Sequence, residues 1–446
     1  ALDQSSSHLI RDNNKCILCR RCVAACANQH VAVIGANNRG FDTQIGCAFE
    51  RELNFVPCVS CGQCIVNCPT GALRERDQCD DVLDALDDES KHVIVHTAPS
   101  IRVTLGEEFG LPIGTNVKGK MVAALRRLGF AKVFDTDFGA DLTIMEEANE
   151  FVERLKNKGE LPMITSCSPG WVKFCEYYYP EFIKNLSTCK SPQQMISAMI
   201  KTFYAKVNNI DPKDIVVVSI MPCTAKKFEI TREDQDAAGV SDTDIVLTTR
   251  ELARLIRRSG INFNELPNED FDEAMGISTG AGAIFGTTGG VMEAALRTAA
   301  DMLSGESQAN VDYEEIRGQD GFKEAVYNIN GIEIRVAVVS GLKNAAKLLD
   351  QIKNGEKDYH FIEVMCCPGG CINGGGQPIQ PAEKKNFDDI KSIRAKALYD
   401  EDKNLPLRKA HESPIIKKVY SEFLEKPGSL IAHKVLHTSY VKRDKY

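Results

Sequence analysis

Eight cysteines near the N-terminus form two copies of one pattern, and this repeat constrains the chain more than any other feature. The first copy is Cys16-x2-Cys19-x2-Cys22-x3-Cys26, and the second is Cys58-x2-Cys61-x2-Cys64-x3-Cys68. The first three thiolates of each copy converge on one iron–sulfur cubane, whereas the fourth lies too far along the chain and ligates the other cubane. We therefore assign one [4Fe–4S] cluster to Cys16, Cys19, Cys22 and Cys68, and a second to Cys26, Cys58, Cys61 and Cys64.

Zinc is the alternative metal for so many cysteines. Zinc sites usually take paired C-x2-C knuckles with four ligands per ion, and the crossed eightfold pattern favours iron–sulfur clusters instead. Two such cubanes catalyse no bond chemistry; they conduct electrons and imply a further redox centre in the chain. Cys47 lies in the loop between the two copies and is interpreted as an idle thiol.

Composition and charge narrow the possible compartments and partners. The 446-residue chain has seventeen cysteines, whereas disulfide frameworks belong mostly to small secreted domains. The clustering of these thiols instead predicts a reducing, anaerobic cytoplasm. A net charge of −8 argues against nucleic acid as a partner. No apolar run approaches the ~18 residues of a membrane span, and residues 1–15 lack the apolar segment of a secretory signal.

Beyond the cysteine repeat the pattern changes to alternating strands and helices. Apolar β-branched runs predict strands at 92–98, 161–166, 214–220, 335–341 and 360–365, and helical periodicity lies at 118–130 and 145–159. Such alternation favours an α/β core with largely parallel sheets. We expect a ferredoxin-like domain over residues 1–84, a catalytic domain over 85–378 and a charged, helical tail over 379–446 that wraps the core.

Three further cysteine-bearing loops each follow an apolar strand: ITSCSPGW (164–171), IMPCTAKKFE (220–229) and EVMCCPGGCINGGGQP (363–378). Ligands of open α/β sheets bind at the carboxyl ends of strands. We therefore expect Cys167, Cys223, Cys367 and Cys371 to lie near each other. Unrelated buried thiols are the alternative, because free cysteines are commonly buried, but their position at three strand ends favours one metal site. The eight histidines are scattered and show no ligand spacing.

These loops resemble the signature loops of the [FeFe]-hydrogenases, whose usual forms are TSCCPxW, MPCxxKxxE and ExMxCxxGCxxGGGxP. The similarity extends over TAPSIR (97–102), DFGADLTIMEE (137–147), SPQQ (191–194) and GAGAIFGTTGGVMEAALR (280–297). The resemblance is to the type with two N-terminal clusters. It implies an α/β core with sheets in two lobes around a buried metal site, a bacterial 2[4Fe–4S] ferredoxin-like domain and a tail like the family's small subunit.

The resemblance also implies the family's H-cluster, a [4Fe–4S] cubane joined through one cysteine to a di-iron unit with CO, cyanide and a bridging dithiolate. Cys223, Cys367 and Cys371 match the cubane ligands, with Cys371 as the bridge to the di-iron unit. Lys226 matches the residue that holds a cyanide ligand. The positions that match the lining of the di-iron pocket are Pro99, Ser100, Gln193, Met221, Phe285, Gly286 and Met365.

A route for protons is implied in the same way. Glu147, Glu150 and Arg154 share one face of a predicted helix, and spacing alone would indicate a solvated charged face. The resemblance reverses that interpretation, because these positions match the family's proton path, with Ser187 between the two glutamates and Cys167 as the last relay. Buried carboxylates with a raised pKa are suitable proton carriers.

The first loop departs from the family pattern, which has a relay cysteine followed directly by a cubane-ligating cysteine. This chain has Cys167 followed by Ser168, and serine is a poor ligand for iron–sulfur clusters. Four explanations stay open: Cys167 turns inward, Ser168 ligates as an alkoxide, Cys366 supplies the thiol, or Ser168 is a bench substitution. A cysteine ligand is favoured over serine. Cys366, where the family usually has alanine, is otherwise a small buried residue without a role.

The predicted function is reversible H2 oxidation and proton reduction, 2 H+ + 2 e− ⇌ H2. The expected electron partner is ferredoxin or a partner subunit, including one of a formate dehydrogenase complex, and maturases would supply the di-iron unit. A hydrogen-sensing or catalytically impaired homologue is one alternative, although sensors commonly lose the relay cysteine that Cys167 matches. A non-catalytic iron–sulfur assembly protein is another, but such proteins lack much of the pocket that Met221, Lys226 and Met365 match here.

Overall fold

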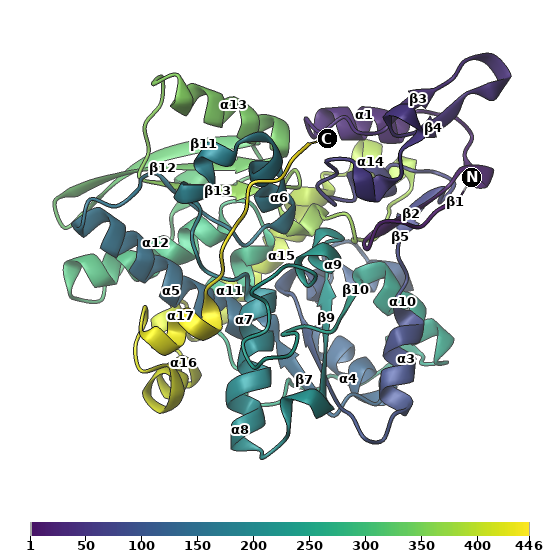
Figure 1. Ribbon diagram of the computed structural model, residues 1–446. Coiled ribbons are helices and arrows are strands. Elements are labelled where there is room, and N and C mark those ends of the chain that lie inside the picture. Colours follow the sequence, from purple (N-terminus) through teal and green to yellow (C-terminus); the bar gives the residue numbers. More distant parts are fainter. Residues whose placement is uncertain (1, 446) are drawn as a thin grey trace.

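The computed structural model describes residues 2–445. Its N-terminal module contains an antiparallel sheet of β1 (Leu2–Asp3), β2 (Leu9–Asp12) and β5 (Leu73–Glu75). It also has a small ribbon of β3 (Gly35–Asn37) and β4 (Gln44–Gly46), and two short helices, α1 (Arg21–Asn28) and α2 (Gln63–Val66). Each helix begins within one cysteine run, so the two halves of the sequence repeat also repeat in structure. The module sits against the two sheets of the main body (Figure 1).

One lobe of the main body is built on a fully parallel sheet in the order β10-β9-β6-β7. Its strands are β6 (His92–Thr97), β7 (Lys132–Asp135), β9 (Ile215–Met221) and β10 (Ile245–Thr248). Alternate residues of β6 face opposite sides: Val93 and Val95 pack with α4 (Lys118–Leu128) and α10 (Thr249–Arg258), whereas Ile94 packs with α7 (Pro192–Met199). Burial on both faces explains the unbroken β-branched runs of these strands.

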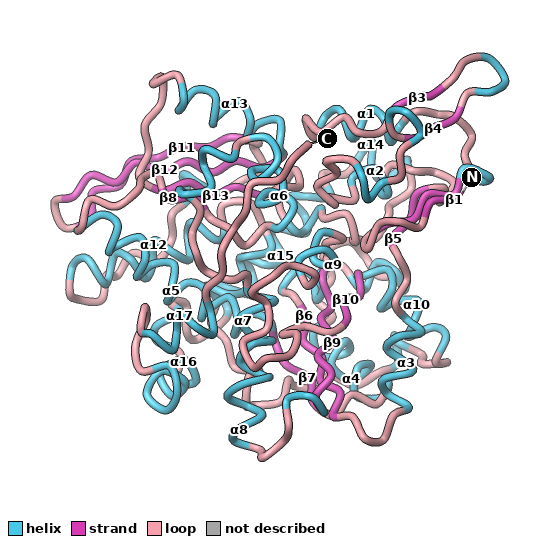
Figure 2. Tube along the Cα trace, in the orientation of Figure 1, coloured by secondary structure: helices cyan, strands magenta, loops and turns pink. Residues whose placement is uncertain are grey.

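The second lobe has a mixed sheet in the order β11-β12-β13-β8, shown apart from the first sheet in Figure 2. β11 (Phe322–Ile329) and β12 (Ile332–Ser340) form an antiparallel hairpin, and β12, β13 (Phe361–Met365) and β8 (Met163–Ile164) run parallel. Helix α12 (Gly290–Ser304) covers one face, while α6 (Pro169–Tyr178) and α13 (Leu342–Lys353) cover the other. The expectation of largely parallel sheets is confirmed, with β11 as an antiparallel edge.

Helix α5 (Thr136–Lys156) joins the two lobes, because its residues pack into the cores of both. The Asp135 side chain caps it by accepting a hydrogen bond from the Asp137 N–H. The sequence predicted this helix only over 145–159, and the structure begins it earlier. The early part, TDFGADLTI, is buried almost throughout, so it lacks the amphipathic period from which a surface helix is recognised.

The C-terminal segment is helical, as predicted, and packs on the main body. It contains α14 (Ala382–Phe387), α15 (Ile390–Asn404), α16 (Pro414–Val419) and α17 (Leu430–Leu436). Buried ion pairs attach α15, since Arg102 contacts Glu401 at 2.9 Å and Arg297 contacts Asp402 at 2.8 Å. The last residues run from α17 past α6 towards the N-terminal module (Figure 1).

The remaining helices are short or peripheral: α3 (Cys79–Asp87), α8 (Ala205–Val207), α9 (Ala225–Glu229) and α11 (Gly280–Ala283). α3 follows the N-terminal module and carries an acidic outer face. Within residues 2–445, no helix combines the length and apolar character that crossing a bilayer requires.

Candidate metal centre between the two lobes

A cavity of about 70 Å³ lies between the two lobes, where β8, β9 and β13 end. β9 belongs to one sheet and the other two strands to the second sheet, so the site forms where two carboxyl edges face each other. Most residues that the sequence pointed to line this cavity: Pro99, Ser100, Cys167, Ser168, Gln193, Met221, Cys223, Lys226, Phe285, Gly286, Met365, Cys366, Cys367 and Cys371.

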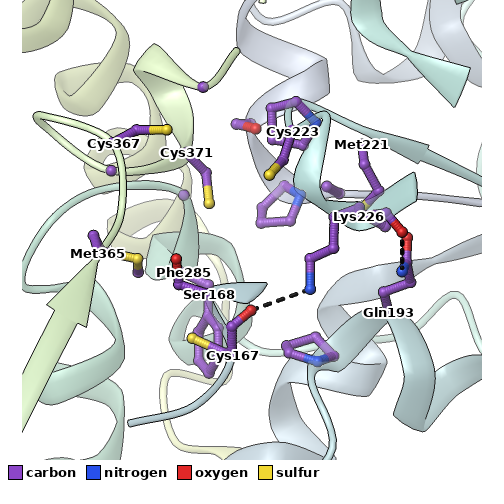
Figure 3. A pocket seen from close by; sticks show the side chains of 18 of the residues that line it. Cys167, Ser168, Gln193, Met221, Cys223, Lys226, Phe285, Met365, Cys367 and Cys371 are labelled. Carbon is purple, nitrogen blue, oxygen red and sulfur yellow. Dashed lines mark hydrogen bonds between the residues drawn. The ribbon is translucent and has the colours of Figure 1, made fainter. Parts of the chain in front are cut away.

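Cys223, Cys367 and Cys371 bring three thiols together from two loops. Figure 3 shows the sulfurs of Cys223 and Cys371 pointing into the same space. Burial, followed by the charge of Cys367, raises the pKa of the Cys371 thiol to about 12, and the same two causes raise the pKa of Cys223. Crowded, buried thiols of this kind gain by binding a metal as thiolates, so the donor set fits an iron–sulfur cubane.

Two glycines, Gly374 and Gly375, allow the loop that carries Cys371 to pack closely against neighbouring backbone. A Cβ atom on Gly374 would lie 2.2 Å from the Pro222 carbonyl oxygen, beside Cys223. A Cβ atom on Gly375 would lie 2.4 Å from the Cys61 carbonyl oxygen. The glycine run after Cys371 is therefore required by backbone packing, both within the site and against the N-terminal module.

Ser168 and Cys366 occupy adjacent positions at this site. The Ser168 Oγ accepts a hydrogen bond from the Cys366 backbone N–H at 3.1 Å. The Cys366 thiol is hydrogen-bonded to the thiols of Cys367 and Cys61, and these contacts together with burial raise its pKa well above the usual range. Cys366 therefore stands between the metal-centre cavity and the N-terminal cysteines.

Lys226 provides a buried cation at the cavity wall. Its ammonium donates to the Cys167 carbonyl oxygen at 3.1 Å (Figure 3). It also donates to Glu229 Oε2 at 2.9 Å. Gln193 donates to the same Glu229 oxygen at 3.0 Å and accepts a hydrogen bond from Ser219 at 2.7 Å. Glu229 thus fixes both polar side chains at the wall.

The Ser100 hydroxyl has no hydrogen-bond partner among residues 2–445 and faces the same cavity. A buried polar atom of this kind normally has a partner. A ligand with polar groups, such as the diatomic ligands of an H-cluster, would satisfy it, so this side of the cavity also fits the cofactor.

Glu147 lies on α5 beneath the cavity and is fully buried. Neither of its carboxyl oxygens meets a donor at full hydrogen-bond geometry within the described part of the chain, and the Ser187 hydroxyl is the side-chain donor that faces the carboxyl group. Burial, followed by the charge of Glu150, raises the pKa of Glu147 to about 8. The Cys167 thiol also has its pKa raised, first by burial and then by the charge of Glu147. The charge of Glu147 therefore acts on the Cys167 thiol.

Glu150 continues this row towards the surface. Its Oε2 accepts a hydrogen bond from Ser187 Oγ at 3.1 Å and its Oε1 pairs with Arg154 at 2.6 Å. Thr188, which the sequence did not single out, donates to Oε2 through its backbone N–H at 3.1 Å and its hydroxyl at 3.2 Å. The predicted residues thus form a row from the cavity, through α5, to the partly exposed Arg154.

The N-terminal cysteines are arranged in the two crossed groups. Cys16, Cys19, Cys22 and Cys68 line one small pocket, and the charge of Cys68 helps burial raise the pKa of Cys22 to about 11. In the other group, burial and the charges of Cys61, Cys58 and Cys26 raise the pKa of Cys64. Each group supplies the four thiols that a [4Fe–4S] cluster needs.

Profile comparison matches residues 91–375 to the family "Iron only hydrogenase large subunit, C-terminal domain". The chain belongs to the iron-only hydrogenase family. Residues 15–72 match a 4Fe-4S dicluster domain and residues 388–443 match the iron hydrogenase small subunit. It is therefore an [FeFe]-hydrogenase that interconverts H2 with protons and electrons, with a 4Fe-4S dicluster domain and an H-cluster.

Comparison with individual proteins supports the same family assignment. The chain is 50% identical over 447 residues to the NADP-reducing hydrogenase subunit HndD of Solidesulfovibrio fructosivorans, covering 99% of this chain and 76% of that protein. It is 47% identical over 443 residues to iron hydrogenase 1 of Clostridium pasteurianum, covering 99% and 77%. A structure of the [FeFe]-hydrogenase HydA1 from Chlamydomonas reinhardtii superposes with a TM-score of 0.72 at 40% identity, covering 82% of this chain and 99% of that one.

Sequence reasoning missed several polar residues that support the site. Glu229 follows Lys226 by three positions on α9, a spacing that signals a helical ion pair. Ser219 and Thr188 give no such signal, because their partners lie far away in the sequence. Their contacts exist only because the fold brings β9 to α7 and the segment before α7 to α5.

Proposed function

We propose that this hydrogenase passes electrons between the metal centre and an external partner through an inner and then an outer cluster. The inner cluster is held by Cys26, Cys58, Cys61 and Cys64, and the outer cluster by Cys16, Cys19, Cys22 and Cys68. The observation that carries this proposal is the position of Cys61, which lines the metal-centre cavity itself. Its carbonyl oxygen lies 4.0 Å from the Cys367 sulfur.

Cys223, Cys367 and Cys371 would hold the cubane of the metal centre, and Cys371 would also provide its link to the di-iron unit. Cys366 supplies the fourth thiol, because its sulfur contacts that of Cys367. Cys167 interacts instead with Glu147 and so stays available as a proton relay. When bound, the H-cluster supplies the redox-active irons at which H2 is made or split.

The other side chains of the cavity bind, orient and exclude water. Lys226 places its cation where an anionic cyanide ligand would lie, held in position by Glu229. Ser100 and Gln193 offer polar groups to the same ligands. The apolar lining keeps water away from the di-iron unit through Pro99, Met221, Phe285, Gly286 and Met365.

Protons move along a row of this chain's own groups. The Cys167 thiol exchanges a proton with Glu147, whose raised pKa keeps a proton on its carboxyl group near neutral pH. Ser187 connects this carboxyl to Glu150, since its hydroxyl donates to Glu150 Oε2. Arg154 stays charged and holds Glu150 in place at the exit.

The electron partner is ferredoxin or a partner subunit, including an electron-transfer subunit or a formate dehydrogenase. The similarity to HndD, named as a subunit of an NADP-reducing hydrogenase, supports work within a complex. Maturases for the di-iron unit are further partners. No disulfide links any of the seventeen cysteines, all of which lie within residues 2–445, and this supports a reducing compartment such as the cytoplasm.

Because Ser168 replaces a usual ligand, a second candidate function is a hydrogen sensor or a catalytically impaired homologue. An infrared spectrum of anaerobically matured protein, combined with an H2 assay, distinguishes the active enzyme from this second candidate. CO and cyanide bands that respond to H2, with rapid turnover, are expected for the enzyme. Bands that respond without turnover would support a sensor. Their absence after maturation would overturn the proposed ligand set.

A further inference from the structure

A buried histidine lies against one ligand of the inner cluster. His8 precedes β2 in the N-terminal module and is 3% exposed. Its Nε2 lies 3.7 Å from the Cys58 sulfur, and its Nδ1 lies 3.2 Å from Ser60 Oγ and 2.6 Å from Ser6 Oγ. Ser6 Oγ also lies 3.2 Å from Nε2. Both ring nitrogens of His8 thus face hydrogen-bonding groups, one of which is a ligand of the inner cluster.

Ser60 connects this histidine to a cation of the catalytic domain. Lys173, on α6, points its ammonium at Ser60 Oγ over 3.3 Å. An ammonium only donates hydrogen bonds and a cluster-bound thiolate only accepts them. A chain of donors that runs from Lys173 to Cys58 therefore has one direction: Lys173 donates to Ser60, the Ser60 hydroxyl donates to His8 Nδ1, and the N–H at Nε2 donates to the Cys58 sulfur.

Lys173 lacks the counter-charge that a buried ammonium usually has. Within residues 2–445 it makes no ion pair with a carboxylate, and its nearest aromatic partner is Phe228, whose ring centre lies 3.8 Å from Nζ. Burial lowers the pKa of Lys173 to about 8, and the charge of Cys58 opposes this effect. The cluster that Cys58 would hold is thus the negative charge that this cation faces.

The surroundings add to this positive field. A cavity of about 350 Å³ beside His8 is lined by Arg76, Lys173 and Arg443. Glu176 is the neighbouring acid, and it is already paired with Arg443 at 2.6 Å and Arg232 at 2.5 Å. At the outer cluster, the Leu18 backbone N–H donates to Cys16 at 3.4 Å and the Thr70 hydroxyl lies 3.8 Å from Cys68. Two arginines line that pocket, but Arg11 is paired with Asp3 at 3.3 Å and Arg20 is exposed to solvent.

We propose that Lys173, Ser60 and His8 form a donor chain that raises the reduction potential of the inner cluster above that of the outer cluster. Hydrogen bonds to cluster sulfurs and nearby positive charge stabilise the reduced form, which carries one more electron. An electron then rests preferentially on the cluster next to the metal centre. This inference depends on the proposed assignment of Cys58 to the inner cluster, and the three residues are positioning residues rather than catalytic ones.

The test is a potentiometric EPR titration of the full, cluster-loaded chain. Lys173→Met and His8→Leu each remove one end of the chain of donors, and Ser60→Ala interrupts its middle. We expect each variant to lower the reduced-to-oxidised ratio of the inner cluster about tenfold at a fixed potential, which is a 59 mV shift for a one-electron couple. The outer cluster is the internal reference and should not shift.

Two control variants complete the design. Lys173→Arg keeps the cation and should keep the inner potential, and Lys353→Met removes an exposed lysine that pairs with Glu181 far from the cluster. An unchanged inner potential in both Lys173→Met and Ser60→Ala would overturn the proposal, as would equal shifts of both clusters. If the wild-type protein binds fewer than two N-terminal clusters, the ligand assignment itself is wrong. Iron content and the number of EPR signals reveal this outcome independently of the potentials.

Discussion

Ser168 Oγ accepts the Cys366 backbone N–H at 3.1 Å, so the two departures from the family's cysteine pattern lie in contact. One loop has lost a thiol and the adjacent loop has gained one. The Cys366 sulfur also contacts Cys367, which we propose as a cubane ligand. This arrangement supports a compensating exchange, in which the fourth ligand has moved from the first loop to the third.

The exchange predicts a rescue. Cys366→Ala should lose the cubane of the metal centre and at least ~tenfold of the H2 turnover, because serine is a poor replacement ligand. Adding Ser168→Cys to that variant should restore both. Iron content, EPR and H2 evolution measure the outcome. Full activity in Cys366→Ala alone would show that Cys167 or Ser168 completes the ligand set.

The second prediction tests the role of Glu147 in proton transfer. Glu147→Gln keeps the shape of the side chain but removes its proton exchange, and H2 evolution should fall by ~100-fold or more. CO and cyanide bands should remain, because the metal centre is intact. Glu153→Gln, on the exposed side of the same helix, should behave like the parent protein. Equal activity in both variants would exclude Glu147 from the path.

The same residue predicts a pH dependence of stability. Its pKa is about 8 in the folded chain, against 4.5 for an ordinary glutamate. Between these values the unfolded carboxyl loses its proton while the folded one keeps it, so the stability that Glu147 contributes falls as the pH rises. Glu147→Gln has no proton to lose. Its melting temperature relative to the parent should therefore be higher at pH 8 than at pH 5.

Much of this architecture was predictable because the decisive signals are local. The crossed cysteine repeat and the three loops at strand ends depend on spacing along the chain, and the structure brings Cys167, Cys223, Cys367 and Cys371 to one cavity. The strands of both sheets could also be predicted, because each is a local run of β-branched residues in the sequence. These features can be recognised before the chain is folded in space.

The parts that escaped prediction depend on contacts between distant segments. The first turns of α5 are buried on all sides and show no helical period. His8 follows no ligand spacing, yet it lies beside Cys58, which is fifty residues further along the chain. Lys173 reaches Ser60 from a different domain. Such positions are decided by tertiary packing, which a single sequence does not display.

The fourth prediction concerns how the C-terminal segment is attached. Arg102 is buried and pairs with Asp135 at 2.7 Å and Glu401 on α15 at 2.9 Å. Arg102→Met would leave the buried carboxylates of Asp135 and Asp137 without their cation, whereas Glu401 would keep its pair with Lys118. The loss should destabilise the protein by about 3–5 kcal/mol. Arg335→Met breaks a surface pair with Asp358 and should cost about 0–1 kcal/mol. Guanidinium unfolding measures both, and equal losses would contradict a structural role for the buried pair.

The final prediction uses the close approach of the two cysteine loops. A Cβ atom on Gly374 would lie 2.2 Å from the Pro222 carbonyl oxygen, so Gly374→Ala must push the Cys371 loop away from Cys223. A shift of about 1 Å in such a site costs on the order of 100-fold in rate. We expect weak or absent CO and cyanide bands with normal N-terminal cluster signals. Gly35→Ala, where a Cβ meets nothing within 4 Å, should leave all signals unchanged. Normal bands in Gly374→Ala would show that the two loops do not share one cluster.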